Sequence, residues 1–151
     1  MKELKVKRIE SGTVIDHIPP GQAPNVLKIL GIRGGSKEVV SMVMNVVGKT
    51  GKKDIVKIEN RELAEDELDQ IALIAPNATI NIIRDYEVVE KYKVTPHDFV
   101  EGVVKCSNPN CISNTNEPIV PKFLVERKKP VVLRCMYCER KITEDIAKYL
   151  I

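Results

Sequence analysis

The chain has 151 residues, which is enough for one domain or for two small ones with a modest hydrophobic core. Its 24 basic and 21 acidic residues leave a net charge of +3, too small to indicate a general coat for nucleic acid. No apolar run is long enough to cross a bilayer, and the first residues alternate charged with single apolar side chains, unlike a signal peptide. The sequence therefore predicts a cytoplasmic protein that binds no membrane, and its abundance of Lys, Glu, Ile and Val is typical of a thermophile.

Residues 1–93 predict a sheet with two helices. Short runs of alternating polar and apolar residues predict strands at 4–9, 13–18, 39–47, 54–59, 78–83 and 86–94. The first helix is expected to begin at Pro24 and end at Gly31, and the second spans 61–76, with acidic residues in its early turns. This order predicts an α+β fold, a ferredoxin-like antiparallel sheet with an extra strand and both helices on one face. We expect the other face to be open to water or to a second copy of the chain.

The strand at 39–47 has the clearest alternation. Val40, Met42, Met44 and Val46 fall on one side of it, and polar residues fall on the other. This pattern predicts a half-buried strand with those four side chains turned inward.

The last third of the chain holds all four cysteines, Cys106, Cys111, Cys135 and Cys138. They are spaced C-x4-C and C-x2-C, with 23 residues between the pairs. In a reducing compartment, two such close pairs indicate a metal site rather than disulfides, and four sulfur ligands leave zinc no open position for catalysis. We expect one structural zinc ion per chain. Intracellular disulfides are the alternative, because thermophiles form them more often.

Two β-branched runs between the cysteine pairs, 118–128 and 130–134, predict a hairpin with a cysteine turn at each end. The sequence therefore predicts a small all-β, zinc-ribbon-like domain over 102–151, joined to the first domain by a linker at 94–101. A unit of about 50 residues is near the size at which a metal must replace missing core.

A surplus of basic residues in this region leaves nucleic-acid binding open as a second function. Residues 1–100 carry 15 basic and 15 acidic residues, whereas 101–151 carry nine and six. A zinc ribbon that binds nucleic acid would suit such a surplus, although only Phe123 and Tyr137 are aromatic between 122 and 141, a thin platform for stacking bases. A solvated rim or a protein docking face is compatible with the same composition. The basic residues of this stretch are Lys122, Arg127, Lys128, Lys129, Arg134, Arg140 and Lys141.

The sequence carries no enzyme signature. The glycine-rich stretch at 31–37 lacks the spacing of a phosphate-binding loop. His17 and His97 are far apart, and neither has a nucleophile beside it in the sequence. We therefore expect a protein that is not an enzyme.

Six segments resemble, in order, the regulatory chain of aspartate carbamoyltransferase. They are GTVIDHIP (12–19), KDIVKIEN (53–60), ALIAPNATIN (72–81), YEVVEK (86–91), CSNPNCIS (106–113) and CMYCE (135–139). The resemblance covers nearly the whole chain and includes the cysteine spacing. It implies a non-catalytic allosteric subunit in the first committed step of de novo pyrimidine biosynthesis. The implied partners are trimers of separate catalytic chains, bridged by homodimers of the regulatory chain.

The resemblance also implies a division of labour. Residues 1–93 would bind the effectors CTP and ATP and form the homodimer, and the zinc domain would dock on the catalytic chain. Asp16 and His17 would lie by the ribose and phosphates, Lys57 by the base and ribose, and Lys91 by the phosphates. The base pocket would be formed by Asn81, Ile83, Tyr86 and Val88, with backbone groups near Ile9 and Tyr86 at the base edge.

The chain departs from the family pattern at a few of these positions. Lys7 and Arg8 stand where the family has an acidic and a small residue, and two extra cations there would favour any triphosphate. Met136 stands where a Lys is expected at the docking face, whereas Asn108 and Asn110 fit the family.

Overall fold

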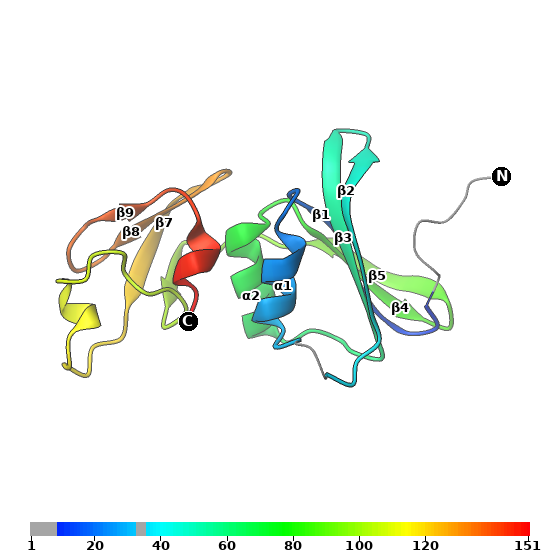
Figure 1. The fold of residues 1–151 in the computed structure, drawn as a ribbon, viewed down its shortest axis with the longest axis horizontal. Coiled ribbons are helices and arrows are strands. Elements are labelled where there is room, and N and C mark those ends of the chain that lie inside the picture. Colours follow the sequence, from blue (N-terminus) through cyan, green and yellow to red (C-terminus); the bar gives the residue numbers. More distant parts are fainter. Residues whose placement is uncertain (1–8, 33–35) are drawn as a thin grey trace.

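The structure is a computed structural model that describes residues 9–32 and 36–151. Of the strand predicted at 4–9, only Ile9 is among them, and Lys7 and Arg8 lie outside the described residues. The first unit contains β1 (Gly12–Ile18), α1 (Ala23–Ile29), β2 (Val40–Gly48), β3 (Gly51–Glu59), α2 (Glu65–Ile74), β4 (Thr79–Arg84) and β5 (Glu87–Lys93). Its strands form one antiparallel sheet in the order β2-β3-β1-β4-β5, and both helices cover one face of it (Figure 1). The predicted ferredoxin-like arrangement with an added edge strand is confirmed.

Alternation along the central strands explains the core of this unit. Side chains at every second position of β1, β3 and β4 point toward the helices and are buried, among them Ile15, Val56 and Ile80. Helix α2 covers them with Ile71 and its neighbours. Its first turn is closed by Glu67, whose carboxylate accepts the backbone N–H of Ala64 at 2.9 Å. Periodicity of two in the strands and 3.6 in the helix therefore buries one continuous apolar layer.

Strand β2 departs from the predicted alternation. Its pairing with β3 shifts register between Val43 and Val46, and Asn45 in this interval has a φ of 60°. Met42 and Met44 are 41% and 38% exposed, so the expectation that they turn inward is wrong. The physical reason is position: β2 is an edge strand, and α1 has only seven residues with which to cover it. The bulge also breaks the side-chain alternation that the sequence pattern assumes.

The second unit is an antiparallel sheet with two short 3-10 turns. It contains β6 (Phe99–Glu101), η1 (Ile112–Asn114), β7 (Lys122–Lys128), β8 (Val131–Cys135), β9 (Lys141–Ile142) and η2 (Ile146–Tyr149), with strand order β6-β7-β8-β9. Residues 99–101, expected in the linker, pair with β7 as an edge strand. The predicted hairpin is present, although its first strand begins at Lys122 rather than near 118.

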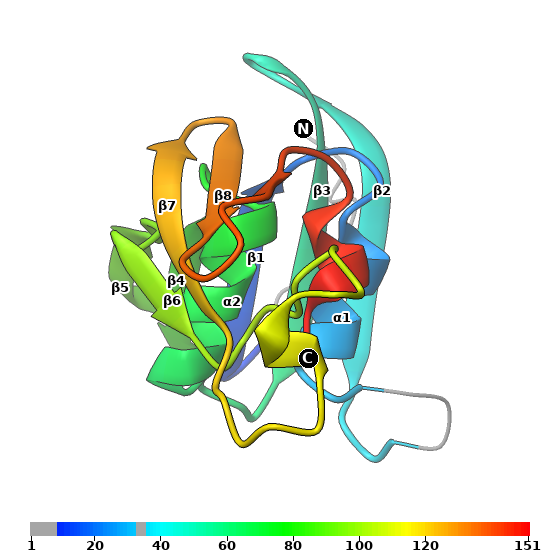
Figure 2. The ribbon, with the colours of Figure 1, turned by 90° about the vertical axis from the view of Figure 1, so that its left-hand side faces the viewer.

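The two units pack against each other through the helices of the first. Turn η2 contacts α2, and one hydrophobic cluster runs from the first sheet through α1 and α2 to Ile146 and the second sheet. Figure 2, seen from the end of the second unit, places η2 and the β7–β8 hairpin in front of the two helices. Among the described residues, no helix is long and apolar enough to cross a membrane.

Candidate metal centre and nucleotide-binding face

The four cysteines converge although they come from different parts of the second unit. Cys106 and Cys111 flank the loop after β6, Cys135 ends β8, and Cys138 lies in the turn to β9. Their Sγ atoms lie 3.5 Å apart for Cys106 and Cys138 and 3.6 Å apart for Cys111 and Cys135, and the four lie within 4.8 Å of one another. A disulfide would bring two sulfurs to about 2.05 Å, so all four thiols are free. Four sulfurs around one tetrahedral zinc ion, each at about 2.3 Å, are separated by about 3.8 Å, and the cluster fits that geometry.

The backbone around the cluster favours thiolates. The backbone N–H of the residue two positions further on is directed at each sulfur: Asn108 at Cys106, Ser113 at Cys111, Tyr137 at Cys135 and Arg140 at Cys138. The Cys135 sulfur also accepts from the backbone N–H of Cys138. The Asn108 contact measures 3.5 Å. N–H dipoles aimed at all four sulfurs suit thiolate ligands, and thiolate is the protonation state that a bound metal requires.

The pKa values of the cysteine thiols shift in opposite directions. Burial raises the pKa of Cys106 to about 12. At Cys138 burial acts in the same direction, but hydrogen bonds from the Arg140 backbone and from neighbouring side chains outweigh it, and the pKa falls to about 7. Four thiolates in one buried cluster would repel one another, and a divalent cation among them removes that conflict. The donor set therefore fits a structural metal.

Side-chain amides hold the first cysteine loop in shape. The Asn114 amide donates to the carbonyl oxygens of Cys106 at 2.9 Å and Asn108 at 2.7 Å. The Asn108 side chain in turn accepts the backbone N–H of Asn110 at 3.0 Å. These bonds satisfy backbone groups of the loop that have no partner in the sheet. Side-chain hydrogen bonds therefore help to hold the loop in the shape that brings Cys106 and Cys111 to the cluster.

In the first unit, the strand register brings several predicted nucleotide residues into one row. Lys57 on β3 lies opposite Val14 on β1, Val14 lies opposite Asn81 on β4, and Asn81 lies opposite Lys91 on β5. Directly opposed residues of antiparallel strands share a face. Because Thr13 and Ile15 point toward the helices, this row lies on the opposite side of the sheet, which we call the outer face. The Asn81 amide also donates to the Val14 carbonyl at 3.4 Å.

A partly apolar group lies at one end of this row. Ile83 pairs with Val88, and Tyr86 in the β4–β5 turn donates its backbone N–H to the Glu10 carbonyl at 2.9 Å, beside Ile9. Ile9 and Ile83 are buried, whereas Tyr86 and Val88 are 55% and 54% exposed. Buried aliphatic side chains next to an exposed tyrosine make a surface on which a flat ring can lie.

Charged groups gather at the other end of the outer face. Asp16 forms an ion pair with Lys53 at 2.9 Å and accepts the backbone N–H of His17 at 2.6 Å. His17 has a φ of 59°, and its Nδ1 lies 2.9 Å from Thr79 Oγ1. The left-handed backbone and the hydroxyl partner fix the direction of the imidazole ring. The two predicted residues of this end are therefore adjacent and held in place.

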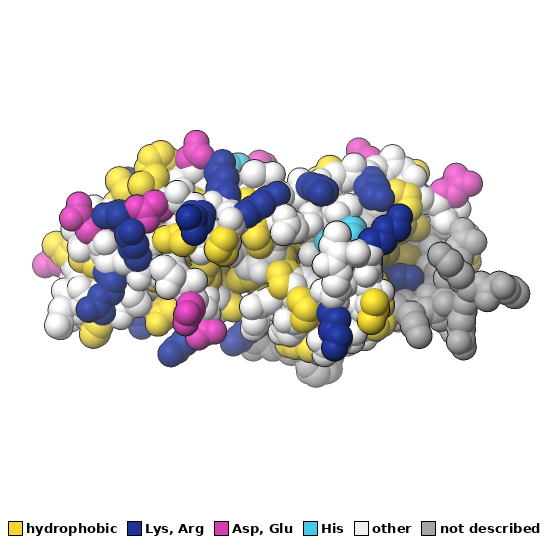
Figure 3. All heavy atoms as spheres, turned by 90° about the horizontal axis from the view of Figure 1, so that it is seen from above, with side chains coloured by type: hydrophobic (Ala, Val, Ile, Leu, Met, Phe, Trp, Pro, Cys, Tyr) yellow, Lys and Arg dark blue, Asp and Glu magenta, His cyan; other side chains and the backbone are white. Residues whose placement is uncertain are grey.

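Beside them is a hollow of about 500 Å³, which we call the basic hollow. Its lining includes His17 together with three lysines, Lys52, Lys53 and Lys93. Figure 3 shows this side of the molecule, where basic side chains gather beside a histidine on the first unit. These three lysines were not predicted from the sequence. A signal existed for Lys93, because it lies two residues from Lys91 on one strand and therefore shares its face.

The basic stretch of the second unit is largely neutralised by ion pairs. Lys128 lies 2.9 Å from Asp98, and Lys122 lies 3.8 Å from Glu101. Glu126 pairs with both Arg134 at 2.6 Å and Lys141 at 3.1 Å, and the hydrogen bond from Arg134, with that from Lys141, lowers the pKa of the Glu126 carboxyl.

Of the two aromatic residues of this stretch, only Tyr137, which is 40% exposed, offers a ring face to nucleic acid. Phe123 is fully buried, and the Tyr137 hydroxyl donates to the Val120 carbonyl at 2.8 Å. A groove for single-stranded nucleic acid needs exposed aromatic faces along unpaired cations. This geometry does not favour the nucleic-acid alternative.

Comparison with known proteins gives matches over both units. Residues 4–95 match the model of the aspartate carbamoyltransferase regulatory chain, allosteric domain, and residues 98–148 match that of the metal binding domain of the same chain. Similar proteins include the aspartate carbamoyltransferase regulatory chains of three archaea. That of Methanothrix thermoacetophila is 66% identical over 99% of this chain and 98% of its own length. Those of Methanocella arvoryzae and Methanopyrus kandleri are 60% and 50% identical, over 99% and 98% of this chain and 97% and 96% of their own lengths.

Proposed function

The chain belongs to the family of aspartate carbamoyltransferase regulatory chains, and from that premise we propose that it senses CTP and ATP for an aspartate carbamoyltransferase complex. It is a regulatory, non-catalytic chain with an allosteric and a metal-binding unit. The reaction it would modulate joins carbamoyl phosphate and aspartate in the first committed step of pyrimidine synthesis. The observation that carries the proposal is the match of both units to one regulatory chain, together with the row of nucleotide-binding candidates on the outer face.

The proposed effector site extends along the outer face. The base would lie against Ile83, Tyr86 and Val88, with the backbone near Ile9 at its edge. Lys57 and Asn81 would reach the base and ribose, and Asp16 would accept from ribose hydroxyls. Lys91 and the basic hollow beside His17 would take the phosphates, because a triphosphate requires several cations and lysine supplies them as point charges.

The proposed metal is zinc, one ion per chain, held by Cys106, Cys111, Cys135 and Cys138. Bound zinc stabilises a small sheet by linking the loop after β6 to the end of β8 and the turn to β9, and four protein ligands leave no site for a reacting molecule. The cysteines are free thiols, as zinc ligands in a reducing cytoplasm would be. We assign the metal unit to docking on catalytic trimers, with Asn108, Asn110 and the half-exposed Met136 on the docking face.

The proposed homodimer forms through the first unit. Edge strand β2 exposes Met42, Met44 and Val47, the last by 78%, and Val39 just before it is 59% exposed. An unpaired edge with apolar side chains is a ready surface for a second sheet. A second copy of the chain is the occupant that the regulatory-chain family implies.

Reconstitution tests the proposal. The metal-loaded chain should co-purify with catalytic aspartate carbamoyltransferase trimers, and CTP and ATP should change the activity of the complex but not of the isolated trimers. Calorimetry on the free chain should detect both nucleotides. Binding to DNA or RNA that weakens steeply with salt, with no association with the trimers, would instead support a zinc-ribbon nucleic-acid-binding protein.

A further inference from the structure

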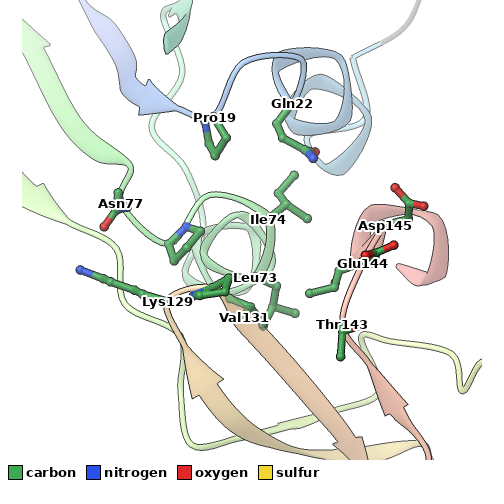
Figure 4. Close-up of a pocket in the computed structure, with 13 residues that line it drawn as sticks. Pro19, Gln22, Leu73, Ile74, Asn77, Lys129, Val131, Thr143, Glu144 and Asp145 are labelled. Carbon is green, nitrogen blue, oxygen red and sulfur yellow. The ribbon is translucent and has the colours of Figure 1, made fainter. Parts of the chain in front are cut away.

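A cavity of about 420 Å³ lies between the two units and shares a wall with the basic hollow (Figure 4). The shared wall consists of Pro19, just after β1, and Asn77, in the turn between α2 and β4: both residues line the interdomain cavity, and both line the basic hollow. The basic hollow therefore adjoins the cavity that the metal unit lines, and Pro19 and Asn77 lie between them.

Lys129 lies on the metal unit's side of this cavity. It stands in the two-residue turn between β7 and β8, next to Pro130. In Figure 4 its side chain runs along the cavity toward the side on which Asn77 lies. Lys129 is exposed, and within residues 9–32 and 36–151 it forms no ion pair, whereas its neighbour Lys128 is held by Asp98 at 2.9 Å.

Two sets of charges act on Lys129: Glu144 and Asp145, which line the same cavity, and the lysines of the basic hollow. Lys52, Lys53 and Lys93 already line it, and of these Lys53 is paired with Asp16. Without an anion these cations repel a further ammonium group. A polyphosphate in the hollow makes the local potential negative. The Lys129 ammonium group, on its flexible four-carbon chain, is then attracted past Asn77 toward the phosphates.

We propose that Lys129 reaches past Asn77 to the terminal phosphates of a nucleoside triphosphate bound in the basic hollow, so that the metal unit completes the effector site. This inference rests on the proposed function and deepens it. The turn that carries Lys129 leads directly into β8, which ends at Cys135. Phosphate binding would therefore act on the strand that holds one of the metal ligands, and the number of phosphates would decide whether the second unit is engaged.

Calorimetric titration of the metal-loaded full chain tests this contact. The ligands are CTP, cytidine and inorganic tripolyphosphate, and the variant is Lys129→Gln. We expect binding of CTP and of tripolyphosphate to weaken about three- to tenfold, the range for one partly exposed charge-assisted contact, and binding of cytidine to stay unchanged. Lys128→Gln is the matched control: it removes the same charge from the adjacent position, and its ammonium group already pairs with Asp98. Its affinities should equal those of the wild type.

A third variant, Lys53→Gln, distinguishes failure of the inference from failure of the proposed function. If Lys53→Gln weakens CTP binding and Lys129→Gln does not, the Lys129 contact is wrong and the effector site stands. Equal losses in Lys129→Gln and Lys128→Gln would reduce the effect to net charge and overturn the contact as well. If the wild type binds neither CTP, ATP nor tripolyphosphate, the proposed effector site and the inference are both wrong.

Discussion

Asp54 shows how one residue can hold three elements of the first unit together. It is fully buried, and its carboxylate accepts backbone N–H groups from Gly21 at 2.9 Å, Ala23 at 3.1 Å and Asn45 at 2.9 Å. Gly21 lies just before the N-cap of α1, Ala23 is the first residue of α1, and Asn45 lies in the β2 bulge. A buried carboxylate is tolerated because its oxygens are bonded to donors that have no other partner at a helix start and a bulge.

Asp54→Ala should therefore lower the free energy of unfolding by about 2–4 kcal/mol, since it leaves three N–H groups without their acceptor in the interior. Denaturant unfolding of the metal-loaded chain measures this. Asp69→Asn is the matched control, because in the part of the chain that the structure describes Asp69 pairs only with exposed His97, and that change should be small. Equal stability of the Asp54 and Asp69 variants would show that the buried carboxylate is not needed.

Lys91 is a second single residue with a testable role, because its ammonium group is expected to bind the phosphates of the effector. A hydrogen bond to a charged group contributes about 1.5–3 kcal/mol, so Lys91→Ala should weaken CTP and ATP binding about tenfold or more and nucleoside binding much less. The residue lies outside the metal unit, so metal content and assembly with catalytic chains should not change.

Calorimetry and assembly assays on Lys91→Ala are compared with those on Lys122→Ala, a lysine of the second sheet. Unaltered nucleotide affinity in Lys91→Ala would remove that residue from the effector site. Lost assembly with intact nucleotide binding would mean that the roles of the two units are reversed.

At the scale of elements, the two edges of the first sheet differ. Strand β5 carries Lys91 and Lys93 along the outer face, whereas β2 exposes mainly apolar side chains. A charge on an exposed edge is a common natural barrier against pairing with another sheet. The β2 edge lacks this protection at Val39, Met42, Met44 and Val47, as expected for an edge that a partner covers.

Val47→Lys should therefore dissociate the proposed homodimer, with a weakening of about tenfold or more for one buried charge at an apolar contact. Sedimentation of the metal-loaded chain at several concentrations measures this. Val89→Lys places the same charge on the opposite edge strand, at a side chain 48% exposed, and should leave the dimer intact. If Val89→Lys dissociated the dimer and Val47→Lys did not, the interface would be formed by β5 rather than by β2.

At the scale of the whole molecule, the metal unit depends on its ion more than the first unit does. Its four strands are short, and its loop of 102–121 is organised around the sulfurs and Asn114. The first unit has a five-stranded sheet covered by two helices, and its part of the shared hydrophobic cluster lies between that sheet and the helices. The folding free energy of such a small metal unit is largely metal-binding free energy.

Chelation should therefore unfold residues from about 102 onward and abolish docking, while residues 1–93 stay folded and dimeric. Circular dichroism and sizing follow the two units. Dithiothreitol without chelator should have no effect, because the sulfurs are not disulfide-bonded. Metal-free protein that still assembles with catalytic trimers would contradict a structural role for the metal.

Local patterns in the sequence were enough for the elements and the metal ligands. Alternation along 13–18, 54–59 and 78–83 predicted the central strands, since burying one face of a sheet imposes a period of two. The helix expected from Pro24 to Gly31 is present as Ala23–Ile29, one residue earlier at its start and two at its end, and Gly31 adopts a φ of 70° that glycine accommodates best. The spacing of the four cysteines predicted one cluster, and the resemblance to aspartate carbamoyltransferase regulatory chains is confirmed along both units.

Other features of the fold depend on strand register and on contacts between segments that are distant in the sequence. Strand register places Lys57, Asn81 and Lys91 in one row, and no local pattern determines which residues face each other across strands. The bulge at Asn45 depends on a hydrogen bond to buried Asp54. The strand at Phe99–Glu101 forms only because it pairs with β7, and the basic hollow is lined by residues from three separate strands. The packing of η2 and Lys129 beside the helices likewise joins residues more than 50 positions apart. Long-range packing determines which side chains become neighbours in the folded chain, and local periodicity in the sequence carries no information about those contacts.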